Sequence, residues 1–180
     1  VQWYICNGQT DHLIETGIDL YKLPLQEKKD ILCSCIYGID IDIHAVEVAK
    51  FSLLIKLIED ETAPSVSEVV PILPDLGDNI QFGNSLVSQT ELNGISGANH
   101  QMMEIAPFDW STINNGCGFD VIIGNPPYVN TEGMHALLPS AEVEIYKKKY
   151  KTSHKQFDKY YIFIEQAINK INENGLVCYI

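Results

Sequence analysis

The chain has 180 residues, of which 46% are hydrophobic, so it is long enough to bury one sizeable core and its length favours a single domain. Its 24 acidic side chains outnumber 12 basic ones, which gives a formal net charge of -12, and all the basic residues are lysines. Without arginine the chain is poorly equipped to read guanine or to bind many phosphates. If its partner is nucleic acid, other parts of a larger protein must hold most of that partner.

The five cysteines are irregularly spaced and no histidines lie at metal-ligand spacing, which favours reduced thiols over a metal site or disulfides. No apolar run approaches the roughly 18 residues of a membrane span, and the N-terminus carries no signal peptide. We therefore expect a soluble, cytoplasmic protein with no metal site and no membrane contact.

The N-terminal part of the chain changes character at Pro24. Residues 1–22 lack periodicity and contain turn-forming glycines, so we expect an irregular or weakly helical lead-in. Residues 25–34 fit a short helix with its lysines outside, and residues 35–40 fit a buried strand that ends in an acid. Asp42 can then cap an amphipathic helix that continues to Ile58.

The middle of the chain is dominated by connections. Prolines and a glycine mark residues 60–78 as a connection, and residues 79–82 predict a brief strand that ends at Gly83-Asn84-Ser85. Residues 86–118 are rich in serine, asparagine and glycine and predict a long surface loop. The apolar run 119–124 then predicts a buried strand.

The C-terminal part returns to regular structure. Residues 142–150 form a charged, lysine-rich segment, and residues 157–171 predict an amphipathic helix that Asn174-Gly175 stops. Residues 176–180 are again typical of a strand. Strands that alternate with helices indicate an α/β fold with a mostly parallel, doubly wound sheet.

Three polar side chains follow predicted strands of this sheet: Asp40, Asn84 and Asn125. Ligands of doubly wound sheets bind outside the carboxyl ends of the strands, so these side chains predict a site. Asp40 is placed to accept the hydroxyls of a ribose, although it could instead cap the next helix. Ile41 could cover one face of an adenine ring or belong to the core. Asn84 could bond an adenine amine or serve a turn.

The tetrapeptide Asn125-Pro126-Pro127-Tyr128 carries the most specific chemistry, although Asn-Pro and Pro-Pro also occur in simple turns. The side-chain oxygen of Asn125 and the carbonyl of Pro126 could each accept one hydrogen of an exocyclic adenine amine. The prolines at 126 and 127 fix φ and keep this clamp rigid. Tyr128 could stack on an extruded base. We expect no general base, because the amine can lose its proton after the methyl group is transferred.

Several segments, in order, resemble the adenine-specific DNA methyltransferase domain of type IIG fused restriction-modification enzymes. The similarity covers almost everything from Lys22 to Ile180, and its motifs are these: residues 25–32, 36–42, 45–50, 76–86, 107–110, 118–128, 150–152 and 157–160. The resemblance implies a Rossmann-like fold that uses S-adenosylmethionine to methylate the exocyclic amine of adenine in double-stranded DNA.

The resemblance also assigns roles to residues. It implies that Asp40 binds the cofactor ribose, that Ile41 packs on the cofactor adenine, and that Asn84 bonds that adenine. Asn125, Pro126, Pro127 and Tyr128 would clamp the flipped-out target base. Asp158 and Tyr160 would lie in a helix that borders the cofactor pocket.

The chain departs from the family pattern at one point. Relatives begin with a strand and a glycine-rich cofactor loop, and in this chain only Cys6-Asn7-Gly8 resembles that loop, and only weakly. We therefore expect residues 1–180 to be a partial methyltransferase catalytic domain whose sheet lacks its first strand. The hypothesis is that this fragment alone is inactive, binds cofactor weakly or not at all, and does not bind DNA tightly.

Two other readings remain open. Protein-glutamine and RNA-guanine methyltransferases use the same tetrapeptide on planar amines, although the long connections and flanking motifs favour DNA. A catalytically silent scaffold or specificity module is the alternative from a different class.

Overall fold

The computed structural model describes residues 1–18, 20–59, 61–67, 69–96 and 98–180. The chain forms two compact units, one from residues 1–38 and 44–80 and the other from residues 39–43 and 81–180. Each unit has a hydrophobic cluster of its own. The described residues form a mixed α/β protein with short sheets.

The first unit begins with two short helices and a hairpin, where the sequence predicted an irregular or weakly helical lead-in. Helix α1 (Gln2–Cys6) and a 3-10 helix, η1 (Thr10–His12), precede an antiparallel hairpin of β1 (Ile14–Gly17) and β2 (Leu20–Lys22). The Asn7-Gly8 turn ends α1, since the Asn7 side chain donates to the carbonyl of Trp3 and Gly8 has a φ of 68°. The turn that the sequence indicated at Asn7-Gly8 therefore ends a helix.

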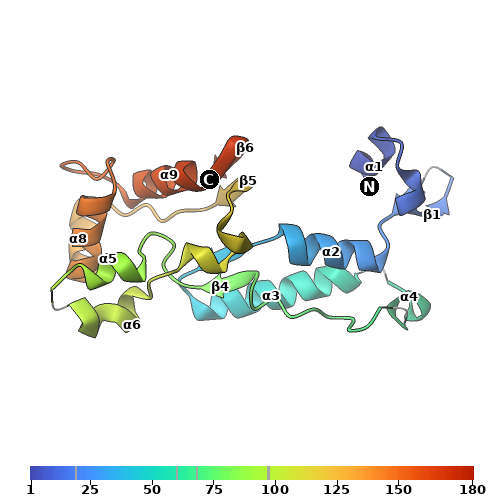
Figure 1. The fold of residues 1–180 in the computed structure, drawn as a ribbon, viewed down its shortest axis with the longest axis horizontal. Coiled ribbons are helices and arrows are strands. Elements are labelled where there is room, and N and C mark those ends of the chain that lie inside the picture. The colour runs from blue at the N-terminus through green and yellow to red at the C-terminus, as the bar shows by residue number, and fades with distance from the viewer. Residues whose placement is uncertain (19, 60, 68, 97) are drawn as a thin grey trace. The chain divides into compact units, whose positions relative to one another are not determined.

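Two longer helices build the core of the first unit. Helices α2 (Leu25–Cys35) and α3 (Ile43–Ile58) lie side by side, and Leu32 of α2 belongs to the same buried cluster as Val46 and Leu57 of α3 (Figure 1). The predicted helix over residues 25–34 is confirmed. A short helix, α4 (Ala63–Ser67), lies within the predicted connection.

Strands β3 (Gly38–Asp40) and β4 (Ile80–Phe82) pair with each other. The Gly38 N–H donates to the Asn79 carbonyl at 2.9 Å and the Gly83 N–H donates to the Asp40 carbonyl at 2.8 Å. From the first bond to the second, the residue numbers increase along both strands, as they do in a parallel pair. Strand β3 is shorter than the predicted 35–40, because α2 continues to Cys35.

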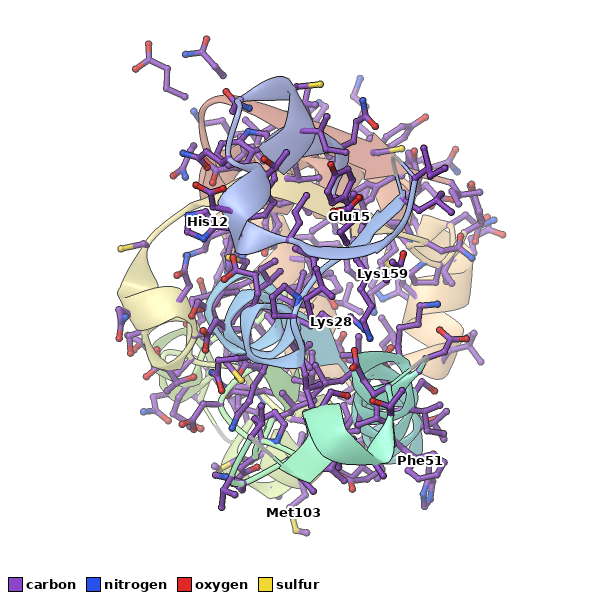
Figure 2. The ribbon with its side chains drawn as sticks, turned by 90° about the vertical axis from the view of Figure 1, so that its right-hand side faces the viewer. His12, Glu15, Lys28, Phe51, Met103 and Lys159 are labelled. Carbon is purple, nitrogen blue, oxygen red and sulfur yellow. The ribbon has the colours of Figure 1, made fainter. Side chains whose placement is uncertain are left out.

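The second unit contains short helices over residues 86–118, where the sequence predicted a long loop. They are α5 (Gln89–Asn93), η2 (Ala98–Gln101), α6 (Met102–Ile105), η3 (Trp110–Thr112) and η4 (Asn114–Gly116). Ser88 and Glu91 form a reciprocal capping box at the start of α5. Leu92 and Ile105 are fully buried, whereas Met103 points outward from α6 (Figure 2). A few buried apolar side chains, such as Leu92 and Ile105, thus hold this largely polar segment against the core.

The parallel pair β5 (Phe119–Gly124) and β6 (Ile171–Tyr179) follows, with helices α7 (Thr131–Leu137), α8 (Ser140–Lys149) and α9 (Lys159–Lys170) between its strands. The strand predicted at 119–124 is confirmed, but the prediction that it is buried is wrong, because its residues are half-buried or exposed and Ile123 is 76% exposed. Strand β6 begins directly after α9, so Asn174-Gly175 does not end the helix as predicted. These two residues lie at a register shift, where Asn174 adopts a φ of 65°.

A buried ionic network supports the second unit. Glu142 of α8 is 2% exposed, and its Oε1 accepts from Asn84 Nδ2 at 3.0 Å, from Lys159 Nζ at 3.3 Å and from the Tyr146 hydroxyl. Burial, and then the neighbouring Glu142 carboxylate, raise the pKa of Tyr146 well above its ordinary value. The hydroxyl therefore stays a donor to the carboxylate.

We expect Lys159→Ala to destabilise the chain by about 3–5 kcal/mol, because it leaves the buried Glu142 carboxylate without its cation. The matched control is Lys148→Ala, which removes an exposed ion pair with Glu144 and should cost at most about 1 kcal/mol. Chemical unfolding of both variants measures the difference. Equal losses of unfolding free energy in the two variants would show that the buried Lys159–Glu142 pair stabilises the chain no more than the exposed Lys148–Glu144 pair does.

Among the described residues, no helix is both long enough and apolar enough to cross a membrane.

Candidate active site

The loop after β5 presents an exposed asparagine. Asn125 is exposed, and within the described part of the chain its side chain makes no hydrogen bond, whereas the adjacent Pro126 is buried. Pro127 is also exposed, and Tyr128 is 69% exposed. The tetrapeptide thus has one buried proline and three exposed side chains that can contact a ligand.

This loop is fixed to the segment that leads into α9. The Lys159 N–H donates to the Val129 carbonyl at 2.8 Å, and the Phe157 N–H donates to the Thr131 hydroxyl at 2.8 Å. The Asp158 carboxylate accepts from the Tyr160 N–H at 2.9 Å and so caps α9. The C-terminal end of the loop is therefore held to this segment by two hydrogen bonds.

Two tyrosines stack beside the loop. The rings of Tyr128 and Tyr160 lie 5.4 Å apart between centroids with an interplanar angle of 9°. The Tyr179 ring of β6 meets Tyr160 edge-on at 6.2 Å. The sequence had placed Tyr160 beside a cofactor pocket by resemblance alone and gave no signal for its stacking on Tyr128.

Asp40 ends β3 and Ile41 follows it, and both are exposed. Asp40 Oδ1 accepts from the Asp42 N–H at 2.8 Å, which holds the turn into α3. Its other carboxylate oxygen has no partner among the described residues. Ile41 is 49% exposed. Both side chains are thus available to a ligand, and their contacts with a ribose and an adenine stay predictions.

Asn84 differs from this pattern because its amide is already bonded within the protein. The residue is 4% exposed, its Oδ1 accepts from the Leu86 N–H at 3.1 Å and its Nδ2 donates to Glu142. The amide holds the turn after β4. A direct bond from this side chain to a cofactor adenine stays a prediction.

The turn after β4 is held by side chains from distant elements, which the sequence did not identify as part of the site. Trp110 and Gln166 both donate to the Ser85 carbonyl, at 3.0 and 3.1 Å. The Tyr150 hydroxyl donates to the Leu86 carbonyl at 2.7 Å. Burial is the main reason that the pKa of Tyr150 is raised, so its hydroxyl remains protonated. Among the three donor residues, Trp110 and Tyr150 lie in motifs of the resemblance, whereas Gln166 does not.

All the predicted site residues belong to the second compact unit: Asp40, Ile41, Asn84, Asn125, Pro126, Pro127 and Tyr128. Five of them are exposed, namely Asp40, Ile41, Asn125, Pro127 and Tyr128. Across the described ranges, no three histidine, cysteine or acidic side chains are grouped so that they could hold a metal ion. The exposed candidate residues thus offer a carboxylate, an amide, two apolar side chains and an aromatic ring.

Fold and site together define a mixed α/β protein with polar and aromatic groups at its strand ends. The model of the Eco57I restriction-modification methylase family matches residues 34–180, and the chain belongs to this family. That match includes every predicted site residue.

Curated relatives agree with this assignment. The chain is 44% identical over 180 residues to the type II restriction enzyme and methyltransferase RM.Eco57I of Escherichia coli, which covers 100% of this chain and 17% of the relative. It is 37% identical over 82 residues to the putative type II restriction enzyme and methyltransferase RM.MjaORFECS2P of Methanocaldococcus jannaschii, covering 46% of this chain and 7% of that protein. It is 35% identical over 57 residues to the type II methyltransferase M.PaeR7I of Pseudomonas aeruginosa, covering 32% of this chain and 9% of that protein.

We expect Gly83→Ala to destabilise the turn that holds Asn84. A Cβ at this position would lie 2.9 Å from the buried Phe108 ring, so the substitution should cost about 1–3 kcal/mol. Gly94→Ala is the control, because Gly94 already has helical backbone angles at the end of α5, and its effect should stay within about 1 kcal/mol. Chemical unfolding compares the two variants. If Gly83→Ala is as stable as Gly94→Ala, the close approach to Phe108 is not a constraint.

Proposed function

We propose that this chain is part of an S-adenosylmethionine-dependent methyltransferase of a restriction-modification system, which methylates the N6 amine of a flipped-out adenine in double-stranded DNA. The observation that carries this proposal is the exposed amide of Asn125, which has no partner among the described residues and follows a parallel strand. The names of the relatives, which combine restriction enzyme and methyltransferase, support the same function.

The proposed chemistry starts from the weak nucleophilicity of adenine N6, whose lone pair is delocalised into the ring. The Asn125 side-chain oxygen and the Pro126 carbonyl would each accept one N6 hydrogen. Two acceptors in fixed positions favour tetrahedral geometry at nitrogen and so direct its lone pair toward the methyl donor. Because Pro126 is buried and both prolines restrict φ, the backbone that carries these two acceptors is restrained before the base arrives.

Tyr128 would hold the base in this position. Its exposed ring offers a stacking surface, and stacking of a base on an aromatic side chain is worth about 1–3 kcal/mol. This contribution offsets part of the cost of removing the base from the duplex. The proton that N6 must lose can leave after transfer, so no basic side chain is assigned.

The exposed residues after β3 fit the proposed cofactor. Asp40 has a carboxylate oxygen available for ribose hydroxyls, and Ile41 offers an apolar surface for the adenine ring. S-adenosylmethionine supplies an activated methyl group when bound. Asn84 would act at this site chiefly by holding the turn after β4.

A finer fold assignment belongs to the same proposal. We infer that β3–β4 and β5–β6, which form separate two-stranded sheets, are parts of one Rossmann-like, doubly wound sheet. The helices between the parallel strands β5 and β6 support this, because parallel strands need such a crossover. One strand between β3 and β5 would join the pairs, in agreement with the resemblance.

The chain spans 17% of the length of RM.Eco57I, so the proposal is tested on the full-length protein. Because this chain carries a net charge of -12, we expect the DNA backbone to be bound by parts of the full-length protein that lie outside this chain. The purified protein is incubated with S-adenosylmethionine and, in parallel, with DNA, RNA or a release factor. Methylation of RNA or of the release factor instead of DNA would support the alternative substrates, and no methylation would support a silent scaffold.

We expect Asn125→Ala in the full-length protein to reduce N6-methyladenine formation at least about a hundredfold, because it removes a preorganised acceptor at the reacting amine. Mass spectrometry of digested DNA quantifies the product. Asn93→Ala, at an exposed asparagine of α5, is the control and should methylate as the unmodified protein does. A fully active Asn125→Ala variant would rule out the clamp.

Asp40→Asn should weaken S-adenosylmethionine binding by about ten- to a hundredfold, since it replaces charge-assisted hydrogen bonds with neutral ones. Titration calorimetry of the full-length protein measures the dissociation constant. The control is Asp30→Asn on α2, where an exposed carboxylate bonds only Gln26 among the described residues. Unchanged affinity in Asp40→Asn would remove this residue from the cofactor site.

A further inference from the structure

We propose that Tyr160 is a positioning residue that holds the ring of Tyr128 in the orientation needed to receive the flipped base, an inference that rests on the proposed function. The two rings are nearly parallel, 9° apart, with centroids 5.4 Å from each other. Tyr160 therefore covers one face of Tyr128. The base stacks on the opposite face, which gives an ordered stack of base, Tyr128 and Tyr160.

Tyr160 is fixed from several sides. Its N–H is bonded by the Asp158 cap at 2.9 Å, and its ring meets the edge of Tyr179 in β6. The preceding residue, Lys159, is anchored to the buried Glu142 through its side chain and to the Val129 carbonyl through its N–H. A ring attached to this part of α9 has little freedom to turn.

Tyr128 has much less support of its own. It lies outside helices and strands and is 69% exposed even with Tyr160 against one face. The two preceding prolines restrict the backbone before Tyr128 but do not restrict the rotation of its side chain. Contact with Tyr160 is what selects the parallel orientation. The stack thus removes rotational freedom before the base arrives, which is the way that preorganisation adds affinity.

This role differs from the one that the resemblance implies, in which Tyr160 borders the cofactor pocket. A cofactor contact would change the affinity for S-adenosylmethionine. Support for Tyr128 would instead change the capture of the extruded base and leave cofactor affinity unchanged. The two roles therefore separate in a binding measurement.

The experiment uses the full-length protein and a DNA duplex that contains its methylation site, mapped by sequencing methylated DNA from cells that express it. A second duplex carries 2-aminopurine, which fluoresces on leaving the base stack, in place of the target adenine. Tyr160→Leu should lower both the flipping signal and the single-turnover methylation rate by about three- to tenfold, the range expected for an aromatic pair. The dissociation constant for S-adenosylmethionine should remain within about twofold of the unmodified protein. The dissociation constant for the duplex should rise by no larger a factor than the flipping signal falls, because the flipping equilibrium is linked to DNA binding.

Further variants make the result specific. Tyr160→Phe keeps the ring and should retain both signals. Tyr161→Leu removes a half-exposed ring that meets Tyr160 edge-on and does not stack on Tyr128, and it should change neither signal. The double variant Tyr128→Leu/Tyr160→Leu should be no worse than Tyr128→Leu alone, since Tyr160 acts through Tyr128. If circular dichroism shows that Tyr160→Leu is unfolded, Tyr160→Met is judged by the same criteria.

The outcomes separate this inference from the function on which it rests. Normal flipping in a folded Tyr160→Leu variant would overturn the inference and leave the methyltransferase proposal intact. Weaker cofactor binding with normal flipping would assign Tyr160 to the cofactor pocket instead. An unmodified protein that methylates no DNA would overturn both proposals.

Discussion

The second unit depends on one buried carboxylate oxygen. Glu142 Oε1 takes hydrogen bonds from the turn after β4, from its own helix and from the first residue of α9. A buried charge is tolerated only when it is paired and hydrogen-bonded, so these donors must come together for the unit to fold. Lys159 in turn bonds the loop that carries Tyr128 through its main chain. A single buried acid thus links the Asn84 turn to the Asn125–Tyr128 loop.

The site shows how the same residue type serves structure in one place and is available for chemistry in another. Asn84 and Asn125 both follow strands, but the amide of Asn84 is buried and bonded at both its oxygen and its nitrogen. Asn125 is exposed and has no partner among the described residues. A bonded amide fixes geometry, whereas an unbonded amide on a rigid loop costs little in water and gains its bonds when a ligand arrives. This contrast supports the assignment of the clamp to Asn125.

Local sequence patterns predicted the elements whose determinants are local. The apolar run that ends at Gly124 gave β5, and residues 25–34 gave most of α2. Residues 86–118 were mispredicted as a loop because polar residues separate their few buried anchors, such as Leu92 and Ile105, and conceal any periodicity. Asn174-Gly175 was predicted to end a helix, but it lies at a register shift inside a strand. The prediction failed because a residue with positive φ occurs at such shifts as well as at helix ends.

The sequence named the exposed residues of the candidate site, but it did not reveal the contacts that hold those residues in place. Asp40 and Asn125 carry chemistry that can be read from residue type and position, but Glu142 and Tyr160 act through contacts with residues distant in the sequence. Such contacts have no period and no motif, so only the three-dimensional structure reveals them. Under the proposed function, this acidic chain would contribute an exposed amide on a restrained loop and an aromatic ring that Tyr160 supports, and the effect of both depends on position and not on the net charge of the chain.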